Sequence, residues 1–257
     1  MMAGHPGSTV RLYTYLSCRV IINRDKGPVV VKVGAPSLHD DLQQIAAVQG
    51  RLPAPVALLI GMAAAMVSLP PLWLTSRYLY TMAHEGGHAF MASVAGLRVT
   101  SVTMKRNGDG LTEAAGKGFG VFLFQFFGYL GPSALGAGAA KLIQVSHIVA
   151  VLWVLLLALG VLLLSARGSV AWMCIIGSGF LLYCIARYAT LGTKVFSAYA
   201  LTWFLLISGV VVVLKHWRTG GDRALLKETT HLPMGLWPPL WLLGSIAALL
   251  AGGTWLV

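Results

Sequence analysis

Long apolar segments constrain the fold of this chain more than any other feature. Each of seven stretches is mostly apolar over about 20 residues, the length a helix needs to cross a bilayer. They are 55–74, 78–97, 119–140, 147–165, 170–191, 195–214 and 236–256. Only 11% of the 257 residues are charged, against about 25% in a soluble domain. The sequence predicts an all-α polytopic membrane protein with about seven transmembrane helices.

The 19 Lys and Arg residues lie mostly between these stretches and give a formal net charge of +11. If the helices alternate from a cytoplasmic N-terminus, segments 1–54, 98–118, 166–169 and 215–235 face the cytoplasm and hold fifteen of them. The outer segments then hold Arg77, Lys141 and Lys194. This excess is the usual topology signal. It predicts a multi-pass protein, in contact with lipid rather than with nucleic acid, because no basic groove with interleaved aromatic residues is present.

Residues 1–54 are predicted to be a cytoplasmic N-terminal tail, partly disordered, and residues 55–257 a transmembrane domain. Within the tail, VRLYTYLSCRVIIN and PVVVKVG have the pattern of short strands, and DDLQQIAAVQ that of an amphipathic turn of helix. The first long apolar run begins near Pro55, too late for a secretory signal peptide. Cys18, Cys174 and Cys184 form no CxxC pair and predict no disulfide framework.

The second apolar stretch contains the motif HEGGH at residues 84–88. Helical residues four apart lie about 40° apart around the axis and about 6 Å apart along it, so His84 and His88 can point at one metal ion. Glu85 lies at a neighbouring azimuth, suited to hold a water rather than the metal. Ionisable residues are costly in a membrane span and indicate function. We therefore predict a zinc site.

An alternative for the same motif is a pair of buried histidines hydrogen-bonded to other helices, with Glu85 protonated. The two central glycines bear on this choice. Gly86 and Gly87 each cost about 1 kcal/mol relative to Ala in a helix. Close approach of another helix or of a substrate backbone explains why they are there.

A small β-hairpin is predicted on the cytoplasmic side, directly after this helix. Residues 99–105 are rich in β-branched side chains, and Asn-Gly-Asp-Gly at 107–110 is a strong tight-turn signal. The hairpin either offers an edge strand to an extended substrate or simply connects two helices. The following stretch carries small residues around Pro132, including Gly128, Gly131 and Gly136. Small residues permit close helix contact, so this face is expected to pack against the HEGGH helix.

The combination of motifs resembles the site-2 protease family of intramembrane zinc metalloproteases. It consists of HEGGH in an apolar stretch, a hairpin with GDGLT, and GYLGPSALG in the next stretch. The later GGDRALLKETTHLPMGLWPPLWLL is similar to the family's C-terminal motif of an Asp, a Thr, a Pro and a Trp-rich final helix. The resemblance covers roughly residues 75–257 and is greatest to compact bacterial members, the peptidase M-fifty-B-like group. It implies a location in a bacterial cell membrane.

The resemblance also implies a third metal ligand, usually an Asp in an LDG sequence, which this chain lacks. Position and motif favour Asp222, although the predicted topology puts HEGGH near mid-membrane and Asp222 in a cytoplasmic segment. Either residues 220–232 fold back into the membrane or the site lies nearer the inner face. The alternative for Asp222 is a solvated N-cap of a short helix. The remaining candidate ligands are Asp109, Glu228, His216 and His231.

The expected function is that of a zinc metalloendopeptidase that cleaves transmembrane or membrane-associated protein substrates. In this hypothesis His84, His88 and Asp222 hold Zn²⁺ and Glu85 is the catalytic proton acceptor, so that residues 55–257 form a metalloprotease-like domain. A catalytically inactive metal-binding scaffold or sensor stays open because LDG is missing. A metal- or proton-coupled transporter needs several ionisable groups along a path, whereas only this cluster and Arg187 are present.

Overall fold

A computed structural model describes residues 11–15, 18–23, 27–32, 37–69, 72–218 and 221–257. Contacts divide the chain into two compact units, Met1–Gln43 and Gln44–Val257. The first contains an antiparallel sheet, in the order β1-β2-β3, of β1 (Arg11–Tyr15), β2 (Cys18–Asn23) and β3 (Gly27–Lys32). Helix α1 (Leu38–Ala46) follows, and the boundary between the units falls inside it. The strand and helix patterns predicted for the tail match these elements. Its partial disorder stays a prediction, since segments such as 1–10 lie outside the described residues.

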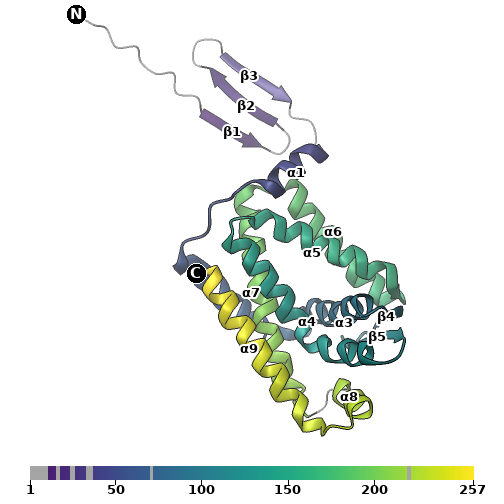
Figure 1. Cartoon of the computed structure of the whole chain (residues 1–257). Coiled ribbons are helices and arrows are strands. Elements are labelled where there is room, and N and C mark those ends of the chain that lie inside the picture. The colour runs from purple at the N-terminus through teal and green to yellow at the C-terminus, as the bar shows by residue number, and fades with distance from the viewer. Residues whose placement is uncertain (1–10, 16–17, 24–26, 33–36, 70–71, 219–220) are drawn as a thin grey trace, which may run out of the picture. The chain divides into compact units, whose positions relative to one another are not determined.

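The second unit is mostly helical, and Figure 1 shows its helices packed side by side. Its elements are α2 (Ala54–Val67), α3 (Trp73–Val94), β4 (Arg98–Met104), β5 (Gly110–Ala115), α4 (Phe119–Gln144), α5 (Ile148–Ser165), β6 (Ala166–Arg167), α6 (Ser169–Tyr188), α7 (Leu191–Lys215), α8 (Asp222–Thr230), the 3-10 turn η1 (Met234–Leu236) and α9 (Trp237–Leu256). Local chemistry explains several helix starts. The Thr190 hydroxyl caps α7 by accepting from the Thr193 amide at 3.3 Å, and prolines stand in the first turns of α2 and α9.

Five helices in the described part of the chain are long and apolar enough to cross a membrane: α4, α5, α6, α7 and α9. They match five of the predicted stretches within a few residues. The first two predicted stretches correspond to α2 and α3, which do not meet the same criteria. Helix α2 has 14 residues, about 21 Å, which is short of a hydrocarbon core of about 30 Å. The structure thus supports an integral membrane protein, and the count of seven spans is not confirmed.

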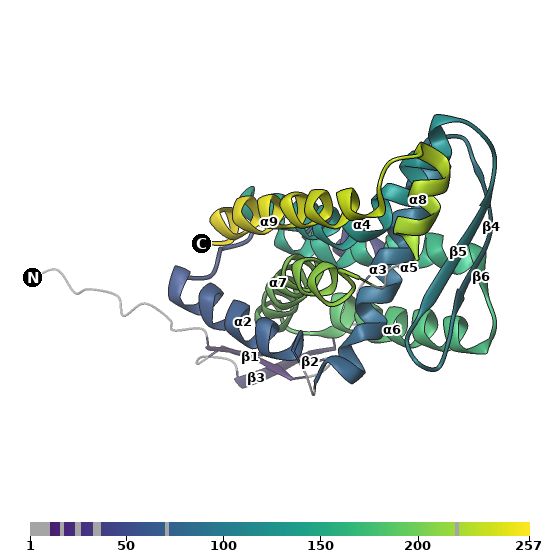
Figure 2. The same ribbon diagram turned by 90° about the horizontal axis from the view of Figure 1, so that it is seen from below.

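The start of the bundle lies at the same end as its C-terminus. The Leu52 amide donates to the hydroxyl of Tyr199, in the first half of α7, at 3.2 Å, and Arg51 donates to the carbonyl of Trp255 at the end of α9 at 2.6 Å. The Val149 amide of α5 donates to the Gln49 side chain at 3.1 Å. Figures 1 and 2 show α2 starting beside the C-terminus. Seven alternating spans would instead separate residue 54 from Val257, so the predicted alternation does not fit these contacts.

The opposite end of the bundle carries a small sheet in the order β5-β4-β6. Strands β4 and β5 pair antiparallel directly after α3, with a register shift between Val99 and Ser101. Strand β6, in the link between α5 and α6, pairs parallel to β4. Gly108 occupies the tight turn with a φ of +83°, a conformation that glycine adopts without steric cost. In the described part of the chain, two small sheets accompany the helices, and β5 is an edge strand of the second.

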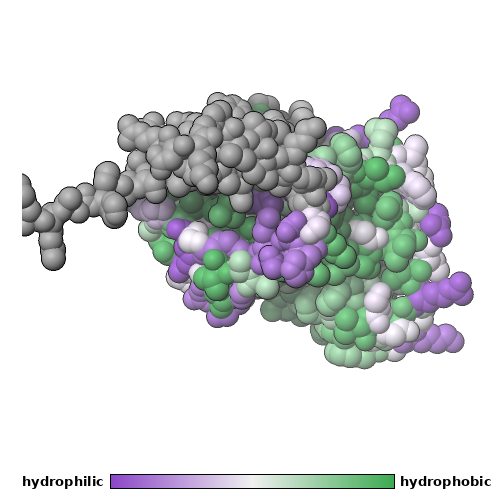
Figure 3. All heavy atoms as spheres, turned by 90° about the horizontal axis from the view of Figure 1, so that it is seen from above, coloured by the Kyte–Doolittle hydropathy of each residue, from purple (hydrophilic) through white to green (hydrophobic). Residues whose placement is uncertain are grey.

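Apolar side chains cover the outside of the helices as well as the core. Figure 3 shows a hydrophobic surface over the helical unit with hydrophilic side chains projecting at its edge. Leu164 and Met173 are 78% and 73% exposed. Patches of this extent are unusual on soluble proteins and are what a bilayer-facing surface requires.

Candidate metal centre

Helix α3 brings His84 and His88 together on one face. Their Nε2 atoms lie 3.3 Å apart, and the two rings meet edge to face with centroids 4.9 Å apart. The spacing follows from a separation of four residues, slightly more than one turn. His88 is 5% exposed. The two nitrogens that point at each other are thus held away from solvent.

The second ring nitrogen of each histidine has its own partner. Nδ1 of His88 lies 2.6 Å from the carbonyl oxygen of Phe124 in α4. A carbonyl only accepts, so Nδ1 carries a proton, and Nε2 is the atom left to donate to Asp222 or, once deprotonated, to bind a metal. Nδ1 of His84 lies 3.1 Å from the hydroxyl of Tyr80, one turn earlier on α3. Partners of this kind fix ring orientation and tautomer in metal sites.

Asp222, the first residue of α8, completes the cluster from a distant part of the sequence. Its Oδ2 lies 3.3 Å from Nε2 of His84 and 3.5 Å from Nε2 of His88. Burial alone would raise the pKa of the Asp222 carboxyl. Its hydrogen bonds with the two imidazoles have a larger, opposite effect, so the pKa lies well below its usual range. The group is therefore a carboxylate at neutral pH, the form that binds a cation.

The three atoms fit a zinc ion on donor type and spacing. Imidazole nitrogen and carboxylate oxygen bind zinc at about 2.0–2.2 Å in a tetrahedron, which requires ligand atoms about 3.3–3.5 Å apart. The observed separations are 3.3, 3.3 and 3.5 Å. Among the described residues these three side chains are the group of His, Cys, Asp or Glu that can hold a metal. Three protein ligands leave a fourth position open, as in catalytic zinc sites.

Glu85 is directed toward the β-hairpin rather than into the cluster. The residue is 3% exposed, and its Oε2 accepts from the Thr112 hydroxyl of β5 at 2.7 Å. A Cβ added at Gly110, where β5 begins, would collide with the Glu85 carboxylate. Two further contacts join α3 to the turn of the hairpin: Thr81 donates to the carbonyl of Gly108 at 2.8 Å, and Tyr78 to that of Arg106. The Glu85 carboxylate therefore lies against an edge strand.

Glycines set the distance between α3 and α4. A Cβ added at Gly87 would lie 2.8 Å from the Cα of Gly131 and from the carbonyl oxygen of Phe127. A Cβ added at Gly128 would fall on the imidazole of His88. The prediction that the small-residue face packs against the HEGGH helix is confirmed. The cluster accordingly lies beside the first half of α4, at the end of the bundle that carries the hairpin.

The structure brings together three of the predicted ligands and separates the remaining candidates from them. Asp109 accepts from the Asn107 amide within the hairpin turn, and Glu228 is exposed on α8. His216 and His231 follow the last residues of α7 and α8. Asp222 reaches the histidines because α8 packs on the part of α4 that α3 contacts: Phe124 is hydrogen-bonded to His88 of α3, and Gln125 to Thr229 of α8.

Sequence reasoning missed several polar contacts of the site. Tyr80 stands four residues before His84, and helical spacing alone identifies it as a partner. Thr112 lies within the GDGLT motif but had no assigned contact. Gln125 accepts from the Thr229 hydroxyl at 2.8 Å. These two residues are 104 positions apart and no pattern links them.

Fold and site together define a helical membrane protein with a buried His-His-Asp cluster and an adjacent carboxylate. The chain matches the family described as Peptidase M50B-like over residues 57–252. It belongs to that family, a domain of the site-2 protease family. No curated protein and no solved structure matched the chain. Membership supports a membrane protease.

Proposed function

We propose that the chain is an intramembrane zinc endopeptidase that cleaves membrane-embedded protein segments. The observation that carries this proposal is the convergence of His84, His88 and Asp222 at separations of 3.3–3.5 Å, with Glu85 as the next residue on the same helix. Family membership supplies the class of reaction. The cluster supplies residues suited to it.

The proposed mechanism assigns a separate task to each part of the site. His84, His88 and Asp222 hold the zinc ion. When bound, zinc polarises a carbonyl and lowers the pKa of a water to about 7. Glu85 accepts a proton from the attacking water and then delivers it to the leaving amine. The Thr112 hydroxyl, which donates to Glu85 at 2.7 Å, holds that carboxylate in place.

The edge position of β5 suggests how the substrate is presented. A helical membrane segment keeps its carbonyls within its own hydrogen bonds, so cleavage requires a locally extended stretch. An extended chain can add to an exposed sheet edge, and β5 is such an edge. A strand paired there passes beside Glu85, because Thr112 and Gly110 of β5 contact its carboxylate.

Metal content of the purified protein tests the proposed site. We expect about one zinc ion per wild-type chain, as three protein ligands bind one ion, little zinc in His84→Ala, and weakened retention in Asp222→Ala. Elemental analysis gives the numbers, and Glu228→Ala, which changes an exposed carboxylate on the same short helix, should keep its zinc. A metal-free wild type would contradict the proposal. Stoichiometric zinc without cleavage of any membrane peptide would favour an inactive scaffold.

We further propose an orientation in the membrane that differs from the alternating topology. At the end with the hairpin and the cluster, segments 95–118, 166–168 and 216–236 contain eight Lys or Arg residues. At the other end, segments 44–53, 145–147 and 189–190 contain Arg51, and the adjoining helix turns add Lys141, Arg187 and Lys194. This makes four, against nine at the hairpin end when Lys215 in the last turn of α7 is included. Positive charge marks the cytoplasmic side. The metal site then faces the cytoplasm, and residues 44–53 lie outside with the C-terminus.

Cysteine labelling in whole cells tests this orientation. In a background without native cysteines, Gly50→Cys should react with a membrane-impermeant maleimide, because Gly50 is exposed with open space around its Cβ position. Lys117→Cys, exposed at the opposite end, should react only after permeabilisation. Reversed accessibility would invert the orientation. If both cysteines react equally with the maleimide from one side of the membrane, the placement of residues 49–52 at the C-terminal end of α9 is contradicted.

A further inference from the structure

Helix α8 supplies Asp222, yet it is a helix of 9 residues outside the five long apolar helices. His84 and His88 are fixed by α3 and by its close contact with α4. The position of the Asp222 carboxylate depends instead on how a short peripheral helix is attached. The contacts that attach α8 therefore determine whether the third ligand meets the other two.

One face of α8 carries its attachments. Asp222, Leu226 and Thr229 stand at positions i, i+4 and i+7, which fall on one side of a helix. Asp222 reaches the histidine pair, and Leu226 is fully buried in the main core. The Thr229 hydroxyl lies 2.8 Å from Oε1 of Gln125 in α4. Gln125 is itself 7% exposed, so this polar group is presented from within the bundle.

The link between Thr229 and Gln125 is kept in either of two hydrogen-bond arrangements. The hydroxyl has one proton and two acceptors in reach, the amide oxygen of Gln125 at 2.8 Å and the carbonyl of Leu225 at 3.0 Å. If the proton goes to Leu225, the Gln125 side chain turns its NH₂ group toward the Thr229 oxygen. The two side chains remain hydrogen-bonded in both cases.

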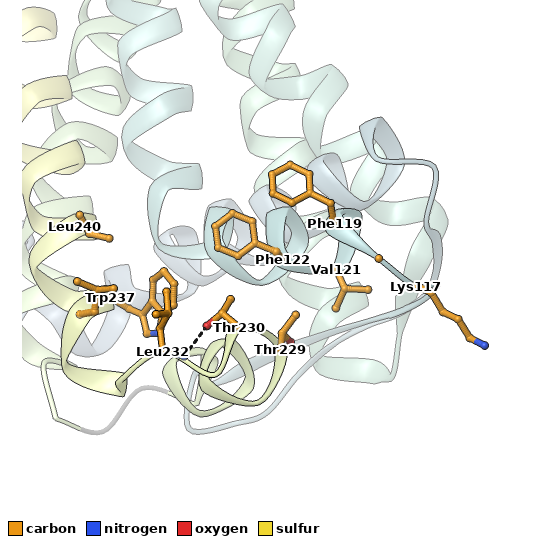
Figure 4. A pocket seen from close by; sticks show the side chains of 11 residues that line it. Lys117, Phe119, Val121, Phe122, Thr229, Thr230, Leu232, Trp237 and Leu240 are labelled. Atoms are coloured by element: carbon orange, nitrogen blue, oxygen red, sulfur yellow. Dashed lines mark hydrogen bonds between the residues drawn. The ribbon is translucent and has the colours of Figure 1, made fainter.

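The two ends of α8 are held differently. At the first turn, the Arg223 guanidinium donates to the carbonyls of Trp217 and Arg218, just beyond the end of α7. At the last turn, Thr229 and Thr230 line a cavity of about 890 Å³ between the start of α4 and the start of α9. Figure 4 shows both threonines at the edge of this space, facing Phe122 and Trp237. Packing does not fill that side of the helix, and among the described residues the hydrogen bond to Gln125 is the polar contact that joins the last turn to α4.

We propose that Gln125 and Thr229 are positioning residues: their hydrogen bond holds the last turn of α8 against α4 and so keeps Asp222 at the metal centre. Without the bond to Gln125, α8 is held at its first turn and by the buried Leu226, and movement of its last turn about these contacts changes the direction of the Asp222 carboxylate. The second attachment, at the last turn, fixes the helix axis and keeps Oδ2 within reach of both imidazoles. This inference rests on the proposed metal site, and it assigns to the pair a role in metal affinity rather than in chemistry.

The zinc affinity of matched variants tests this positioning role. Thr229→Val keeps the size of the side chain and removes the hydroxyl, and we expect about 10-fold weaker zinc binding in competition with a chromophoric chelator, as for other groups that orient metal ligands. Thr229→Ser retains the hydroxyl and should bind like wild type. Thr254→Val makes the same change at an exposed site on α9 and should have no effect.

A double-mutant cycle separates positioning from general destabilisation. If Thr229 acts through Asp222, then Thr229→Val should weaken zinc binding no further in an Asp222→Asn background. Equal losses in both backgrounds, or unchanged affinity of Thr229→Val, would overturn the inference.

Hydrogen exchange tests the same inference without metal. In metal-free protein, Thr229→Val should speed amide exchange within residues 222–230 and leave α5 unchanged. Unchanged exchange in α8 would also overturn it. If the wild type binds no zinc, the proposed metal site fails, and the exchange result still decides whether the Thr229–Gln125 pair holds α8.

Discussion

Replacing Glu85 by Gln should strongly slow proteolysis while leaving zinc in place. The amide has the shape of the carboxylate and still accepts from the Thr112 hydroxyl, which lies 2.7 Å from Oε2 in the native chain. It cannot accept a proton from water. General base catalysis contributes about 10²- to 10⁴-fold, so we expect a loss of that size in the cleavage rate of a membrane peptide.

The matched control for this variant is Glu113→Gln on β5. Glu113 is exposed and accepts from Ser101 at 2.7 Å. Its replacement by Gln makes the same chemical change one residue from Thr112 without touching the cluster, and it leaves unchanged the main chain of β5, with which the proposed substrate strand would pair. It should retain activity. Cleavage by Glu85→Gln at the wild-type rate would remove Glu85 from the mechanism, and loss of zinc from that variant would show that it supports the metal site instead.

Gly131→Val should force α3 and α4 apart. A Cβ at this position would lie 2.8 Å from the carbonyl oxygen of Ala83 and from the Cα of Gly87, and backbone atoms cannot move aside as a flexible side chain can. Overpacking of this kind costs about 1–3 kcal/mol. In a chain of this size we expect Tm to fall by roughly 2–12 °C. Zinc affinity should fall too, because Nδ1 of His88 is held by a carbonyl of α4.

Gly138→Val provides the control on the same helix. A Cβ at Gly138 meets nothing within 4 Å, so an identical substitution there should leave Tm and zinc content close to wild type. Thermal unfolding in detergent, followed by metal analysis, compares the two. Similar behaviour of both variants would show that the α3–α4 contact is not the constraint on the site.

The parts of the fold that follow local rules were predictable from the sequence. Five membrane helices correspond to long apolar runs, and their bounds agree because burial in lipid demands continuous apolar character. The pairing of His84 with His88 follows from helical periodicity alone. The turn at Gly108 follows from a residue pattern that favours positive φ.

The global arrangement was not predictable by the same route. The predicted topology counts every apolar run as one crossing of the membrane. If a short helix such as α2 is wrongly counted as a crossing, all residues before it are assigned to the wrong side of the membrane. The contacts of residues 49–52 with Tyr199 and Trp255 join positions about 150–200 apart, and no periodicity encodes them. The hydrogen bond between Thr229 and Gln125 could not be predicted for the same reason, because it joins residues 104 positions apart.

The delivery of Asp222 by α8 has a consequence during synthesis. His88 leaves the ribosome 134 residues before Asp222, which at 5–20 residues per second is roughly 7–27 seconds. Throughout that interval the growing polypeptide holds a two-imidazole half-site. For the proposed zinc site, full affinity then arises only after α7 is in place and α8 has docked, so a truncated or stalled chain lacks the third proposed ligand.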